Sequence, residues 1–193
     1  MERELKYVDM EEQPISMHPK KFALWLFMVT VVMVFAGLTS AYIVRQSEGN
    51  WLDYELPAIF WLTSGIAVMS SLTLQWASYS ARKDNFVNLK TGMVLTVLLG
   101  IAFLVGQWYS WVAMVDREVF FVGNPSGSFL YVFTGLHAVH LISGVIFLII
   151  VLISTFRLKV HSRAMIPMEM ATTYWHFLGG LWLYLFMFLL LNH

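Results

Sequence analysis

The chain of 193 residues contains no cysteine. This absence excludes disulfide bonds, cysteine-ligated zinc, iron–sulfur clusters and the covalent attachment of c-type haem within the chain. A metal site in this chain would need histidine or carboxylate ligands instead.

Charged residues are also scarce. They make up 12% of the chain, whereas a soluble globular domain has about 25%, and the mean hydropathy is +0.68. The charges fall in short clusters separated by long uncharged runs, which is typical of a polytopic membrane protein. The formal net charge of zero does not favour nucleic acid as a partner.

Five apolar runs are long enough to cross a bilayer once each, because about 20 helical residues span its core of roughly 30 Å. None of them alternates between polar and apolar residues as a barrel strand does. We therefore predict an all-α, polytopic membrane protein, a bundle of five transmembrane helices. The predicted helices cover residues 22–44, 58–81, 91–115, 126–156 and 169–192 of a membrane domain that spans residues 22–193.

Residues 1–21 are polar and of mixed charge, and we predict that they form a cytoplasmic N-terminal segment. The segment lacks the short apolar core and small-residue cleavage site of a signal peptide. Of the 12 lysines and arginines, ten lie in this segment or in the second and fourth connections, and only Arg45 and Arg117 lie in the first and third. The positive-inside rule therefore predicts a cytoplasmic N-terminus and a C-terminus on the opposite side of the membrane.

No Asp, Glu, Lys or Arg lies in the interior of the five runs, and Glu169 stands at the start of the fifth. Ion-coupled transporters and pumps generally need such groups within the bilayer. Their absence argues against a chain that moves protons or metal ions by itself. The chain also lacks the internal repeat of a transporter built from two inverted halves.

Histidines are the most informative polar residues within the runs. His137, His140 and Gly144 follow helical spacing, so we expect them on one face of the fourth helix, and His176 lies in the fifth. Three interpretations stay open: hydrogen bonds between helices or to lipid, a haem clamped by histidines of two helices, or a non-haem metal site. We expect His176 nearer the cytoplasmic side than His137 and His140, which disfavours one metal bound by all three.

Three further groups of residues indicate how the helices are anchored and packed. Tryptophans near the run ends are expected at the membrane interface, and small residues are expected to let helices approach closely. We expect Gln75, Gln107 and residues 70–73 to form ordinary hydrogen bonds between helices. The tryptophans are Trp25, Trp61, Trp76, Trp108, Trp111 and Trp175, and the small residues include Gly37, Ser40, Ala41, Gly100, Gly106, Gly135, Gly144, Gly179 and Gly180.

Three stretches of the chain stand out as motifs. They are Phe35-Ala36-Gly37, the run Thr134-Gly135-Leu136-His137-Ala138-Val139-His140 that leads to Gly144, and Glu169 followed by Trp175-His176-Phe177 and Trp182. With these motifs the chain resembles subunit III of the haem–copper terminal oxidases, in its bacterial five-helix form. The resemblance covers nearly the whole membrane part of the chain, and the motifs occur in the family's order.

The resemblance implies an accessory, non-catalytic subunit of an aerobic respiratory oxidase. Such a subunit has no catalytic, cofactor-binding or metal-binding residue, because haem and copper belong to its partners. It packs with subunits I and II, binds phospholipid, and can join a supercomplex with an upstream quinol–cytochrome c reductase. The residues His137, His140, Gly144, Glu169, Trp175 and His176 then become structural or lipid-contact residues of a multi-pass protein in the bacterial inner membrane, with a periplasmic C-terminus.

Two departures from the family pattern narrow this expectation. The longer family form has seven helices, and the five here match the last five, so another chain would supply the missing pair. Many members carry a carboxylate where this chain has Val31, which opposes a proton role. The electron donor, cytochrome c or quinol, stays open. So do two alternatives: a membrane haem protein that uses His137 or His140 with His176, and the related accessory subunit of a quinol oxidase or nitric oxide reductase.

Overall fold

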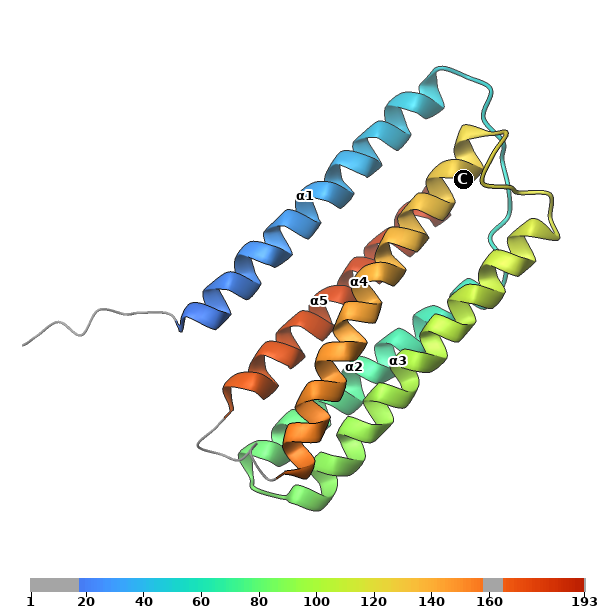
Figure 1. Cartoon of the computed structure of the whole chain (residues 1–193). Coiled ribbons are helices and arrows are strands. Elements are labelled where there is room, and N and C mark those ends of the chain that lie inside the picture. Colours follow the sequence, from blue (N-terminus) through green and yellow to red (C-terminus); the bar gives the residue numbers. More distant parts are fainter. Residues whose placement is uncertain (1–17, 158–164, 193) are drawn as a thin grey trace, which may run out of the picture.

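The computed structural model describes residues 18–157 and 165–192. Within these residues the chain forms no β-strand and five α-helices: α1 (Pro19–Ser47), α2 (Ile59–Arg82), α3 (Phe86–Val115), α4 (Pro125–Phe156) and α5 (Ile166–Leu191). All five are long and apolar enough to cross a membrane, so the predicted all-α fold with five spans is confirmed (Figure 1). Most of the predicted N-terminal segment and much of the basic fourth connection lie outside the described residues.

Capping side chains and prolines decide where three of the helices begin. Pro19 occupies the first turn of α1, where a missing N–H costs little, and His18 accepts a hydrogen bond from a backbone N–H of that turn. Asn85 and Asn124 cap α3 and α4 in the same way. Because Asn85 caps α3, this helix begins at Phe86 and not at the predicted residue 91.

The helices α2, α3, α4 and α5 form a four-helix core. In this core α2 packs beside α3 and α5, and α4 packs beside the same two helices. The helices α2 and α4 therefore face each other diagonally across the core. The first helix, α1, lies outside this core against α4 and α5 (Figure 1).

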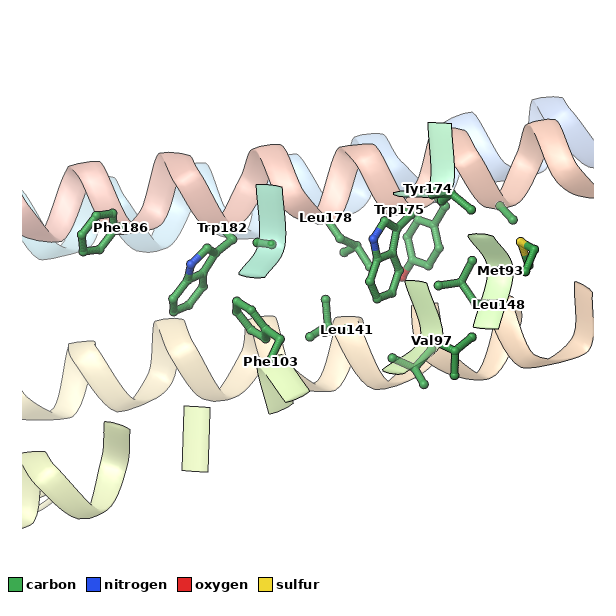
Figure 2. Packing of buried hydrophobic residues seen from close by; sticks show 14 of the residues in the cluster. Met93, Val97, Phe103, Leu141, Leu148, Tyr174, Trp175, Leu178, Trp182 and Phe186 are labelled. Carbon is green, nitrogen blue, oxygen red and sulfur yellow. The ribbon is translucent and has the colours of Figure 1, made fainter. Parts of the chain in front are cut away.

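Aromatic side chains fill the centre of the four-helix core. Trp182 of α5 lies parallel to Phe60 of α2 at 6.0 Å between ring centroids and meets Phe103 of α3 edge-on at 4.9 Å. Edge-on contacts are favoured because the positive ring edge meets the negative ring face. Figure 2 shows Trp182 and Trp175 projecting from the same helix into the space that also holds Phe103 and Leu141.

The helix α1 is fastened to α5 at both ends. Lys21 Nζ pairs with Glu169 of α5 at 2.5 Å, and we call this the Lys21 end of the molecule. At the opposite end, Tyr42 and Gln46 donate hydrogen bonds to the backbone carbonyl of Asn192, at 2.6 and 3.1 Å; we call this the Asn192 end. The helices α1 and α5 therefore run in the same direction.

Large apolar side chains cover the outer surface of the molecule. Met33 is 68% exposed, Leu62 64% and Val139 61%, on three different helices. Exposing such side chains to water is unfavourable, whereas they suit the hydrocarbon of a bilayer. Together with the five spans, this surface indicates a multi-pass membrane protein.

Candidate functional site

His137 lies inside the four-helix core, only 1% exposed. Its ring centroid is 5.2 Å from that of Trp182 on α5 and 6.1 Å from that of Phe103 on α3. Within the described part of the chain, neither of its ring nitrogens has a hydrogen-bond partner. The imidazole of His137 is therefore packed against aromatic rings, while its two polar ring nitrogens are buried without a partner among the described residues.

His140 faces α1 and not the centre of the core. Its Nδ1 lies 2.8 Å from the carbonyl oxygen of Leu136, one turn earlier in the same helix. Its ring lies 6.2 Å from that of Phe27 and 6.0 Å from that of Phe35. Val31 is buried midway between these two phenylalanines on the same side of α1, so the surface that covers His140 is apolar.

The predicted single face for His137, His140 and Gly144 is therefore only partly right. At 3.6 residues per turn, Gly144 is rotated by about 20° from His137, whereas His140 is rotated by about 60°. His137 and Gly144 both face the core, where an added Cβ at Gly144 would lie 2.7 Å from Leu178 Cδ1. His140 falls in the neighbouring seam between α4 and α1.

His176 points to a third place, the outer seam between α5 and α2. Its Nε2 lies 3.2 Å from Oε1 of Gln75 on α2. The residue before it, Trp175, contacts the Gly144 position one turn from His140. His176 therefore lies nearer the Lys21 end than His137, which contacts Trp182 further along α5. The histidines differ in direction as well as in depth.

No group of three or more His, Cys, Asp or Glu side chains within the described residues is arranged to hold a metal ion. The three histidines in the spans contact different helices, with His137 facing α3 and α5, His140 facing α1, and His176 facing α2. A haem clamped by two histidines needs both to face one space. The arrangement offers single imidazoles that add polarity to helix packing.

Trp175 is a core residue, and its prediction as an interfacial anchor was wrong. It is 4% exposed, and its Nε1 donates a hydrogen bond to Ser70 Oγ on α2 at 3.0 Å. Its indole fits against Gly100 and Gly144, where an added Cβ would lie 2.7 and 3.4 Å from its ring. By contrast, exposed tryptophans of the predicted set occur on α1, α2 and α3: Trp25, Trp61, Trp76 and Trp108.

Trp182 repeats this arrangement and was not recognised as a core residue from the sequence. Its Nε1 donates a hydrogen bond to Ser64 Oγ at 3.0 Å. Trp175 and Trp182 are seven residues apart, which places both indoles on one face of α5. Ser64 and Ser70 lie on the buried face of α2. The seven-residue spacing was the signal that could have identified this face.

Glu169 lies in the first turn of α5, as predicted, and pairs with Lys21 of α1. Both side chains are 36% exposed. A carboxylate at this position also interacts favourably with the positive end of the helix dipole. Glu169 thus joins two helices at the Lys21 end.

The predicted hydrogen bonds between helices have two different outcomes. The hydrogen bonds expected between helices are confirmed for Gln75 with His176 and for Thr73 with Thr96, whose hydroxyl oxygens are 2.9 Å apart. Gln107 differs, because its buried amide has no partner among the described residues.

The close approach expected at Gly37, Ser40 and Ala41 is also absent from the described structure, since nothing lies within 4 Å of an added Cβ at Gly37. These residues instead line an open groove of about 790 Å³ between α1 and the start of α4, near the Asn192 end. Arg45 lines it from α1, and Asn124 and Ser128 line it from the start of α4. We call it the α1–α4 groove.

Two more grooves flank His176 on the outer surface. One, of about 460 Å³, lies between α2 and α5 and is lined by Ser71, Gln75 and Gly179 among others. The other, of about 430 Å³, lies between α1 and α5 and includes Phe35 and Tyr184.

Comparison with known proteins supplies a family for this five-helix arrangement. Residues 52–192 match the family described as cytochrome c oxidase subunit III. The chain is 28% identical over 169 residues to "Cytochrome c oxidase subunit 3" of Corynebacterium diphtheriae, which covers 83% of this chain and 82% of that protein. It is 30% identical over 167 residues to "Probable cytochrome c oxidase subunit 3" of Nocardia farcinica, with coverage of 83% and 82%.

A third relative is matched over a smaller part of its own length. "Cytochrome c oxidase subunit 3" of Rhipicephalus sanguineus is 30% identical over 139 residues, or 70% of this chain and 51% of that protein. The family match spans all of α2 to α5, including both core tryptophans and all three histidines of the spans. The chain belongs to the cytochrome c oxidase subunit III family of the haem–copper oxidases.

Proposed function

We propose that the chain is the accessory, non-catalytic subunit III of an aerobic respiratory haem–copper oxidase. The observation that carries this proposal is the family match over residues 52–192, across the whole four-helix core. In this role the chain stabilises the catalytic subunit and organises lipid around it, while electron transfer to oxygen and proton translocation take place in the partner subunits.

The directions of the histidines support a role without a haem of its own. His140 Nδ1 lies against its own helix backbone and His176 Nε2 against Gln75, which leaves neither of these nitrogens open toward a shared space. His137 lies behind aromatic rings of two helices. The apolar, buried Val31, between the two phenylalanines of α1 that contact His140, supports a chain that takes no part in proton transfer.

The α1–α4 groove supports the proposed lipid role. Its α1 wall of small residues leaves space for acyl chains, and Arg45, Asn124 and Ser128 lie toward the Asn192 end, where a phospholipid head group would lie. The grooves beside His176 offer further apolar surface to lipid or to a partner helix.

The names of the relatives favour cytochrome c over quinol as the electron donor of the complex. We propose that the haem and copper are held by subunits I and II, beside which this chain sits in a bacterial cell membrane. Its N-terminus is then cytoplasmic and its C-terminus periplasmic, as the distribution of lysine and arginine predicts.

Purification of the tagged chain from its native membrane tests the assignment. We expect subunits I and II to copurify, the complex to have a haem absorbance spectrum, and the complex to oxidise reduced cytochrome c. Recovery of the folded chain with neither subunit would contradict the proposal. A complex that oxidises only quinol would overturn the choice of donor but not the accessory role.

A substitution in the α1–α4 groove tests the lipid role. Gly37→Leu adds a side chain where an added Cβ meets nothing within 4 Å, so it fills groove space without a clash inside the chain. We expect the purified complex to lose bound phospholipid, measured by native mass spectrometry. Gly135→Leu is the matched control, because Gly135 is equally open but does not line the groove. Equal lipid content in both variants would contradict the lipid role.

A further inference from the structure

A small internal cavity lies in the four-helix core beside His137. Its volume, taken as the space open to the centre of a water molecule, is about 10 Å³, which is close to the minimum for one water. All four core helices contribute to its wall. The lining residues are Ala67, Ser70, Phe103, His137, Leu141, Trp175, Leu178, Gly179 and Trp182.

His137 brings unsatisfied polar atoms to this wall. Both ring nitrogens are buried, and neither has a partner among the described residues. A neutral imidazole has one N–H donor and one acceptor nitrogen. Leaving both unpaired away from water is unfavourable, and buried polar groups in native proteins nearly always have a partner, often an ordered water.

Ser70 supplies the second polar atom of the cavity. Its hydroxyl donates to the carbonyl oxygen of Ala67 at 2.8 Å and accepts from Trp175 Nε1 at 3.0 Å. A hydroxyl oxygen has two lone pairs, so one acceptor position is still available. The indole N–H groups are not available, because that of Trp175 is bonded to Ser70 and that of Trp182 to Ser64.

The remaining wall is apolar, and a fully apolar cavity of this size would stay dry. Here a histidine of α4 and a serine of α2 face the same small space. A water molecule needs at least two polar partners to be held in such a site. The two residues provide them from helices that lie diagonally across the core and have no close backbone contact within the described residues.

We propose that this cavity binds one structural water molecule, which bridges a ring nitrogen of His137 on α4 to Ser70 Oγ on α2. The water donates one hydrogen to the serine oxygen and either donates to or accepts from the imidazole. It links α2 and α4, one of the two diagonal pairs of core helices that have no close backbone contact within the described residues. The site does not depend on the proposed oxidase role, because every group in it belongs to this chain.

A density map with resolved waters, from electron cryo-microscopy of the chain in the assembly purified from its membrane, tests the proposal. We expect one water peak within hydrogen-bonding distance, about 2.7–3.2 Å, of both Ser70 Oγ and a His137 nitrogen. An empty cavity in a map that resolves other internal waters would overturn the proposal. So would a direct bond from His137 to Gln107 with no water at Ser70.

Variants give a second measurement of the same site. We expect infrared difference spectra in H₂¹⁸O to show a shifted O–H band for the wild type and for His140→Phe, and no such band for His137→Phe. His140→Phe is the matched control, because it removes an imidazole from the same helix outside the cavity. If His137→Phe does not assemble, Ser70→Ala replaces it, with the same loss expected. If the shifted O–H band persists in His137→Phe or in Ser70→Ala, the proposed water site is wrong.

Discussion

Trp175 of α5 and Ser70 of α2 are joined by a hydrogen bond of 3.0 Å inside the core, although 105 positions separate them in the chain. The bond connects the last helix to the first helix of the four-helix core. Trp182 and Ser64 form a second bond of the same type and length. Two indole-to-hydroxyl bonds therefore hold the α2–α5 pair in register.

The first prediction concerns these bonds. Trp175→Phe and Ser70→Ala should each destabilise the core, on the order of 1 kcal/mol for the lost bond, with a further loss for the smaller ring. The double variant should cost less than the sum of the two, because both remove one interaction. Thermal unfolding in detergent measures the three differences.

Trp175→Phe with Ser64→Ala is the control, since those residues belong to different bonds, and the effects of these two changes should be additive. A coupling as large in the control pair would contradict the assignment.

The second prediction compares two glycines of α4. Gly144→Leu should destabilise the bundle by about 1–3 kcal/mol, because overpacking forces neighbours to move. An added Cβ at Gly144 already lies 2.7 Å from Leu178 Cδ1 and 3.4 Å from the Trp175 ring, whereas nothing lies within 4 Å at Gly135. Gly135→Leu should therefore be close to neutral in thermal unfolding and in the yield of assembled complex. Equal losses in both variants would show that the contact at Gly144 is not decisive.

The third prediction concerns the Lys21–Glu169 pair. Both side chains are 36% exposed, so its contribution is small, about 0.2–1 kcal/mol. Glu169→Gln should leave global unfolding nearly unchanged but increase hydrogen exchange in the first turns of α1. The double exchange Lys21→Glu with Glu169→Lys should restore part of the protection. Arg45→Met is the control, because Arg45 pairs with Glu48 near its own helix end and does not reach α5. Unchanged exchange in Glu169→Gln would exclude a role in fastening α1.

The fourth prediction tests the histidines as packing residues. His137→Ala, His140→Ala and His176→Ala should each leave the haem absorbance of the purified complex intact. His137→Ala and His176→Ala should loosen assembly or lipid retention. The His176 change leaves Gln75 without its partner at 3.2 Å. An unsatisfied polar group costs about 1–3 kcal/mol of stability when it is buried. The cost is smaller for Gln75, because its side chain is exposed. Loss of haem absorbance with unchanged subunit composition would identify a ligand histidine and contradict this interpretation.

Several features of the candidate site were predictable because they depend on local spacing. Glu169 at the start of α5 and Gln75 as a hydrogen-bonding group follow from their places in the apolar runs. The core position of Trp175 was missed, since an indole near a run end resembles an interfacial anchor until its neighbours are known. Two facing glycines, Gly100 and Gly144, decide that it turns inward.

The sequence by itself determined the number of helices, their membrane character and the family. These depend on run length and on the cost of unpaired backbone groups in lipid, both of which are local properties of the chain. The tertiary structure decided where each polar side chain points. A rotation of about 60° around the α4 axis separates His137 in the core from His140 against α1, and only the packing of the neighbouring helices sets which side of that axis is buried.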